Sequence, residues 1–185
     1  METPEPSPQS VAQTSGGAPP ADRLFFLTLT TQGRQPWLAI PRTRDVFLAV
    51  LRSWHMERDG RVLAAMAMPD HAQVLLEPGK ALTTVQLVAR WKTAMRMGAG
   101  YAETFQNDTQ GHRLQVTENP EDYGLYLFLK PYRARLIRTD QPWPGWWLPD
   151  PAAFTFPAAL NKQGCPPPAW ADWPEEKFAR LNVPR

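Results

Sequence analysis

Residues 24–58 hold one strand-like and one helix-like pattern of hydrophobic and polar positions. The run LFFLTLT at 24–30 is apolar and rich in β-favouring residues, which predicts a first strand. A turn-like stretch follows, and residues 43–58 then show the stripe of an amphipathic helix that ends before Gly60. The apolar positions of that stripe are Val46, Phe47, Val50, Leu51 and Trp54.

The same alternation continues downstream. Residues 62–68 and 72–77 are apolar runs of strand length, separated by the breaker Pro69-Asp70. Residues 82–101 predict a second helix and 112–117 a short fourth strand. The apolar positions of this second helix are Val85, Leu87, Val88, Trp91, Ala94 and Met95.

A third helix has the clearest start signal in the chain. Asn119 has the residue type of an N-cap, Pro120 suits the first helical position, and two carboxylates follow. We expect this helix to end near Leu129, because Pro131 cannot continue it undisturbed.

The resulting order is β-α-β-β-α-β followed by a helix, which predicts the α+β class and a ferredoxin-like plait. In such a plait the helices cover one face of an antiparallel sheet, and we expect the other face to be open for a ligand.

Proline divides the chain into three parts. Of the 21 prolines, five fall in residues 1–22, six in 23–138 and ten in 139–185. Residues 1–22 lack any apolar pattern and are expected to be disordered. We expect a globular domain over 23–147 and a Pro- and Trp-rich arm over 148–185 that wraps around it, because exposed tryptophans would reduce solubility.

Charge and composition narrow the function classes. Residues 23–138 carry 16 Lys and Arg against 10 Asp and Glu, a net charge of +6, while the whole chain carries only +2. A basic core favours an anionic partner such as a nucleic acid. The sequence shows no membrane-spanning run and no secretory signal, and the single Cys165 excludes a disulfide framework. A bacterial-type cytoplasm is the expected compartment.

The segment 68–77, MPDHAQVLLE, holds the candidate chemistry. His71 and Gln73 lie two apart on a strand, so their side chains leave the same face of the sheet. Ala72, Val74 and Leu76 point to the opposite face, towards the helices. Two histidines at this spacing would converge on one divalent cation, but the second position offers an amide oxygen instead.

Four stretches of the chain, in order, resemble the single-tyrosine HUH transposases, in particular the REP-associated tyrosine transposases. MPDHAQVLLEP is similar to their MPDHxHLLLEP signature. Phe105-Gln106 with Gly111-His112, then 121–137, then DQPW at 140–143 resemble three later motifs of that family. The similarity extends through most of residues 23–147 and implies a ferredoxin-like catalytic domain.

The resemblance also implies a chemistry. In the family a helix tyrosine attacks a phosphate of single-stranded, hairpin-bearing DNA, which gives a 5′-phosphotyrosine and a free 3′-hydroxyl. The matching position here is Tyr126. A tyrosine of ordinary pKa near 10 needs help at neutral pH, and Mg²⁺ or Mn²⁺ supplies it in the family. The matching ligand positions are His71, Gln73 and Lys130.

Two of these positions depart from the family pattern. A protonated Lys130 has donors only and cannot coordinate a cation, whereas Gln73 can do so through its amide oxygen. Two interpretations stay open. Either Lys130 replaces the metal as a fixed positive charge and cleavage persists, or the site is degraded and the protein binds DNA without cutting it. In the second case no cofactor is expected.

Two groups of basic residues are candidates for contact with DNA; each could equally be an ordinary solvated surface. The first lies on the second helix and the other surrounds the end of the third, where Tyr132 could add base stacking. These residues are Arg90, Lys92, Arg96, Lys130, Arg133, Arg135 and Arg138. The expected partner is single-stranded or hairpin DNA, with no membrane, and a homodimer is compatible with the chain. An RNA-binding plait is the weaker rival, since no strand carries the aromatic-rich motif that such a sheet needs.

Overall fold

Five strands form one antiparallel sheet in the computed structural model, which describes residues 19–56, 60–100 and 105–183. The sheet has the strand order β4-β1-β3-β2-β5. Its strands are β1 (Phe25–Thr30), β2 (Gly60–Ala67), β3 (His71–Pro78), β4 (Gln110–Arg113) and β5 (Trp146–Trp147). The helices are α1 (Pro41–Met56), α2 (Thr84–Ala99) and α3 (Pro120–Arg133). The predicted α+β class and the β-α-β-β-α-β order are therefore confirmed.

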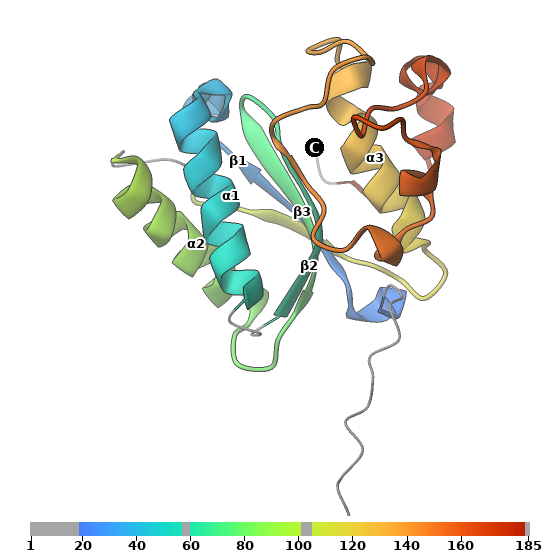
Figure 1. Cartoon of the computed structure of the whole chain (residues 1–185). Helices are drawn as coiled ribbons and strands as arrows, with labels where there is room; N and C mark the ends of the chain where they lie inside the picture. The colour runs from blue at the N-terminus through green and yellow to red at the C-terminus, as the bar shows by residue number, and fades with distance from the viewer. Residues whose placement is uncertain (1–18, 57–59, 101–104, 184–185) are drawn as a thin grey trace, which may run out of the picture.

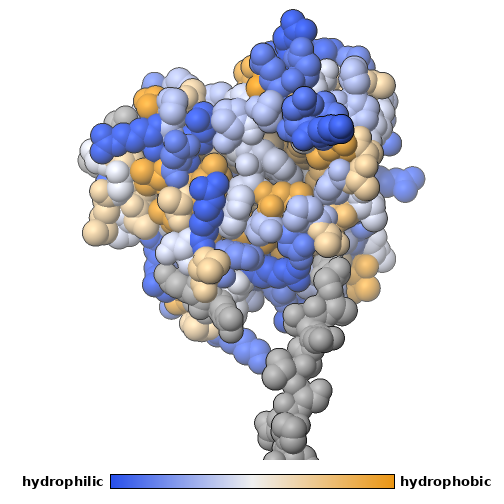
Figure 2. All heavy atoms as spheres, in the orientation of Figure 1, coloured by the Kyte–Doolittle hydropathy of each residue, from blue (hydrophilic) through white to orange (hydrophobic). Residues whose placement is uncertain are grey.

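The sheet separates two hydrophobic cores. On one face α1 and α2 lie side by side, and α3 lies on the other face (Figure 1). Ala72, Val74 and Leu76 of β3 belong to the core under α1 and α2, as the strand alternation predicts. Phe26 and Leu75 belong to the core under α3. Over α1 and α2, hydrophobic side chains also reach the surface among hydrophilic ones (Figure 2).

The helix starts follow the capping signals of the sequence. Thr83 caps α2 through a reciprocal pair of hydrogen bonds with Gln86. Asn119 caps α3 by accepting a hydrogen bond from the backbone N–H of Glu121. The expected end of α3 near Leu129 is wrong, because the helix continues through Pro131 to Arg133. Pro131 is tolerated because it lies in the last turn of the helix. The helix still closes normally, since the Ala134 N–H donates to the Lys130 carbonyl.

The expectation of an open sheet face is wrong as well. The face opposite α1 and α2 is covered by α3 and by the chain that follows it (Figure 1). Tyr123, Leu127 and Phe128 of α3 are buried against this face. Phe154, Phe156 and Phe178 of the C-terminal arm then join the same core. Aromatic residues concentrated in a proline-rich tail supply the apolar area that holds the arm in place.

The segment between α3 and the arm closes one edge of the sheet. The N–H of Ala67 donates to the carbonyl of Gly145, and the indole N–H of Trp143 donates to the carbonyl of Ala67 at 2.9 Å. A Cβ on Gly145 would lie 2.3 Å from that same carbonyl, so only glycine fits this close approach. In the arm itself, Asp150 forms an ion pair with Arg61 of β2.

Two expectations on the boundaries need adjustment. The fourth strand lies at Gln110–Arg113 rather than 112–117, because its pairing with β1 stops at Phe25 and leaves Val116 exposed. Of the tail expected to be disordered, residues 1–18 lie outside the described residues, and Ala21–Arg23 form a short 3-10 helix. In the described parts of the chain, no helix is both long and apolar enough to cross a membrane.

Candidate functional site

Strand β3 presents the two residues of the His-x-Gln pattern to the face that carries α3. Gln73 sits opposite Thr28 of β1 and Met66 of β2, in the middle of the sheet, and only 1% of its surface is exposed. Its amide N–H donates to the Thr28 hydroxyl at 3.2 Å. His71 begins the strand and is mostly buried.

Helix α3 brings Tyr126 and Lys130 down onto this pair. The two residues are four apart and therefore lie on the same side of the helix. The Lys130 ammonium donates to the Gln73 amide oxygen at 2.6 Å and lies 5.6 Å from the centre of the Tyr126 ring. The Tyr126 ring itself tilts over Phe26 of β1, with 6.5 Å between ring centres. The fold thus brings the four central residues of the predicted site together.

A carboxylate and an arginine complete the cluster. Asp70 accepts a hydrogen bond from His71 Nδ1 at 2.6 Å and forms an ion pair with Arg34 at 3.2 Å. With its Nδ1–H donated to Asp70, a neutral His71 keeps its lone pair on Nε2. The sequence reasoning did not assign roles to Asp70, Arg34 or Thr28. The only available signals were the position of Asp70 next to His71 and a threonine in an otherwise apolar strand.

The titration properties of the cluster follow from burial and from its excess of cations. Burial lowers the pKa of Lys130 to about 8; Arg34 acts in the same direction and Asp70 opposes both. Burial and the Lys130 charge also lower the pKa of His71, although Asp70 works against them. Burial alone would raise the pKa of Asp70, but its hydrogen bonds with His71 and Arg34 bring it below the usual value.

The residues as placed do not fit the divalent cation that the resemblance implies. The Gln73 amide oxygen already accepts from the Lys130 ammonium, so a dication at that oxygen would meet a positive charge within hydrogen-bond distance. Within the described ranges, no group of three or more His, Cys, Asp or Glu side chains could hold a metal ion. A metal held by His71 and Gln73 therefore stays a prediction that the placement of Lys130 disfavours.

The three arginines beyond Lys130 lie beside the arm, each paired with a carboxylate. Arg133 and Arg135 form ion pairs at 2.6 Å with Glu175 and Asp172 respectively. Arg138 pairs with its near neighbour Asp140 at 2.9 Å. Arg133 also lies over the ring of Phe178, which contacts Tyr126 edge-on at 5.6 Å between ring centres.

The basic residues of α2 lie across the sheet from this cluster. Lys92 donates to the backbone carbonyls of Gln106 and Asn107, and Arg96 makes a long hydrogen bond to Thr93. Arg90 lines a groove between α1 and α2. The fold therefore separates the predicted DNA-binding residues into two groups on opposite faces of the sheet.

Comparisons with known proteins identify the fold. No family model matches the chain, and no curated protein matches it. A solved structure of a REP-associated tyrosine transposase bound to a REP hairpin is similar, with a TM-score of 0.55 and 15% sequence identity. That match covers 68% of this chain and 76% of the transposase. A structure described as a transposase from Deinococcus radiodurans R1 has a TM-score of 0.43 and 17% identity, covering 50% of this chain and 78% of its own. The chain thus shares the fold of the REP-associated transposase.

Proposed function

We propose that this protein binds hairpin or single-stranded DNA on the fold of a REP-associated tyrosine transposase, and that it binds without metal-dependent cleavage by Tyr126. The similar transposase structure contains a REP hairpin, which supports the choice of ligand. The observation that carries the proposal is the contact between the Lys130 ammonium and the Gln73 amide oxygen.

The cluster around Lys130 suits a phosphate better than a metal. Lys130 and Arg34 place two cations near His71, and one carboxylate, Asp70, balances them only in part. Lys130 is mostly protonated at neutral pH, because its pKa of about 8 lies above 7. A phosphodiester brought to this cluster would meet charge-assisted donors without any bound ion.

The arginines beyond α3 extend this basic surface at little energetic cost. Arg135 and its partner Asp172 are 71% and 65% exposed, and Arg138 and its partner Asp140 are 80% and 59% exposed. Exposed ion pairs of this kind contribute at most about 1 kcal/mol, so a DNA phosphate can replace Asp172 or Asp140. The release of counterions from DNA would offset the free energy lost when the arginine exchanges its carboxylate for a phosphate.

A second candidate function keeps the tyrosine chemistry. Lys130 lies 5.6 Å from the centre of the Tyr126 ring, where its charge could stabilise a developing phosphorane in place of a metal. The phenol oxygen would bond to phosphorus, the phosphorus–oxygen bond to the 3′ side would break, and the phenol proton would end on the released 3′-hydroxyl.

A binding and cleavage experiment separates the two functions. Fluorescence anisotropy with a labelled DNA hairpin is measured at several salt concentrations, and the same samples are examined for an adduct that resists denaturation, with and without Mg²⁺ or Mn²⁺. We expect salt-dependent binding, no adduct, and the same affinity for Tyr126→Phe. An adduct that Tyr126→Phe abolishes would instead establish the second function.

The location of the DNA is tested by charge removal. The pair Arg135→Gln and Arg138→Gln should reduce the slope of log affinity against log salt by about 2, one unit for each lost phosphate contact. Arg42→Gln provides the matched control, because Arg42 is an exposed arginine in the first turn of α1. If no hairpin binds at any salt concentration, the proposed function is wrong.

A further inference from the structure

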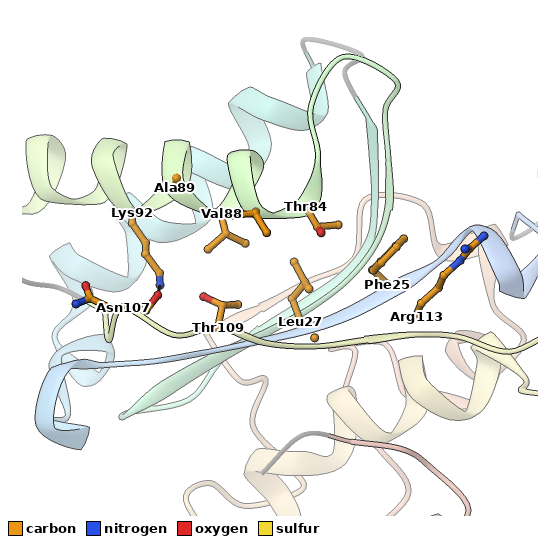
Figure 3. A pocket seen from close by; sticks show the side chains of 11 residues that line it. Phe25, Leu27, Thr84, Val88, Ala89, Lys92, Asn107, Thr109 and Arg113 are labelled. Carbon is orange, nitrogen blue, oxygen red and sulfur yellow. Dashed lines mark hydrogen bonds between the residues drawn. The ribbon is translucent and has the colours of Figure 1, made fainter.

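A second site lies on the far side of the sheet from Tyr126. A groove of about 540 Å³ runs between α2 and the strands β1 and β4. Leu27 of β1 and Val88 of α2 point towards each other across its middle, and Phe25 lies beside them (Figure 3). Opposite Leu27 lies Gly111 of β4, where the Leu27 side chain packs so closely that a Cβ would come within 2.9 Å of it.

The other end of the groove is polar and positively charged. Lys92, Asn107 and Thr109 gather at this end (Figure 3). A second hollow of about 380 Å³ shares Lys92 and Asn107 with the groove and adds Arg96. The two hollows therefore adjoin at Lys92 and Asn107. The groove is apolar in its middle and has a cation at each end, with Arg113 beside Phe25 and Lys92 at the far end (Figure 3).

We propose that these two adjoining hollows bind a nucleoside monophosphate, with its base against Phe25, Leu27 and Val88 and its phosphate between Lys92 and Arg96. The groove alone has the volume of a small-molecule site, and a flat apolar ring that carries one anionic group matches its apolar middle and the cations at its Lys92 end. The choice of a nucleotide among such ligands rests on the proposed function. The nucleotide can be free or part of a single DNA strand.

The side chains around the groove are arranged for such a ligand. The carbonyls of Gln106 and Asn107 hold the Lys92 ammonium at the junction of the two hollows. Val85 is 77% exposed at the rim, although the helix pattern places it in the core. A bound base would cover this apolar surface.

Amide chemical shifts test the site at its own residues. Titration of the full chain with deoxythymidine monophosphate should move the amide signals of Thr109 and Gly111 saturably. Ala89→Trp places a large ring where the two hollows meet and should weaken this binding at least about tenfold. Met97→Trp, at an 82% exposed position of the same helix, should leave it unchanged.

A second variant tests the phosphate end without filling the groove. Arg96→Gln should weaken binding of deoxythymidine monophosphate about fivefold and leave binding of deoxythymidine unchanged, because only the monophosphate carries the charge. Arg42→Gln should affect neither ligand. Equal losses for both ligands would contradict the proposed orientation.

The outcomes separate the two ligand sources and the two proposals. Shifts with free nucleotide identify a free ligand, and shifts only with single-stranded oligothymidylate identify a strand-borne one. No shift with either probe, or shifts that Ala89→Trp leaves intact, would overturn the site. If the hairpin binds but neither deoxythymidine monophosphate nor oligothymidylate moves the Thr109 and Gly111 amide signals, this inference alone is refuted. Nucleotide binding without hairpin binding refutes the proposed function alone.

Discussion

Replacing Lys130 with methionine should change how the stability of the protein depends on pH. Methionine keeps much of the apolar stem of lysine but cannot be charged. The loss of the ammonium leaves the buried Gln73 amide oxygen without this donor, which lowers stability at every pH by about 1–3 kcal/mol. Removal of a buried charge acts in the opposite direction. Only the pH dependence isolates the titration of Lys130.

The magnitude follows from the pKa of Lys130, about 8 in the folded protein against 10.5 for an ordinary lysine. Because the folded state holds this proton less tightly, the protein gains stability as the pH rises from about 8 towards 10.5 and loses it on acidification. Between about pH 6.5 and about pH 9.5 this gain amounts to about 2 kcal/mol. Burial raises the pKa of Tyr132 to about 12, an effect that both proteins share.

Urea unfolding at several pH values measures the effect. The free energy of unfolding of the wild type minus that of Lys130→Met should rise by about 2 kcal/mol across this range. Lys80→Met, which removes an exposed lysine, should produce a difference that does not depend on pH. A flat difference for Lys130→Met as well would show that Lys130 is not buried as a charge, and the assignment of the site would fail with it.

Three further predictions concern the metal, the close contact at Gly145 and the carboxylate of Glu118, which accepts hydrogen bonds from the Tyr123 hydroxyl and the Gln115 backbone N–H. Gln73→His combined with Lys130→Asn should create Mn²⁺ binding detectable by calorimetry, whereas Gln73→His alone should not, because the ammonium remains. Gly145→Ala should destabilise the protein by about 2–4 kcal/mol in thermal unfolding, since its Cβ would collide with the Ala67 carbonyl. Glu118, with a pKa of about 2, should contribute stability above about pH 4.5 that is lost as the pH falls towards 2, and Glu118→Gln should flatten this acid limb in urea titrations.

Local signals in the sequence determined most of the fold. Asn119 and Pro120 fixed the start of α3 to the residue, because a cap depends on immediate neighbours. The end of the same helix was misjudged at Pro131, since tolerance of proline depends on how soon the helix stops. Val85 shows the same limit: periodicity places it in the core, but its side chain is 77% exposed beside the groove between α2 and the strands β1 and β4.

The candidate site was predictable in its members and not in their contacts. The spacing of His71 and Gln73, and of Tyr126 and Lys130, shows that each pair shares a face. No local pattern could reveal that Lys130 would take the amide oxygen of Gln73, because this contact joins residues 57 positions apart. The sequence also predicts an open sheet face where α3 and the arm in fact cover it, for a related reason. Its aromatic contacts come from an arm without regular periodicity.

The segment 143–147 beside β2 has a consequence for the behaviour of the isolated chain. A strand at the border of a sheet offers unpaired N–H and C=O groups that can recruit a strand from another molecule. Trp143, Gly145 and β5 occupy part of that border along β2. A protein shortened before residue 143 would lose this shield together with the aromatic cover of α3. We expect it to aggregate through the uncovered edge, so point substitutions are the safer way to study the arm.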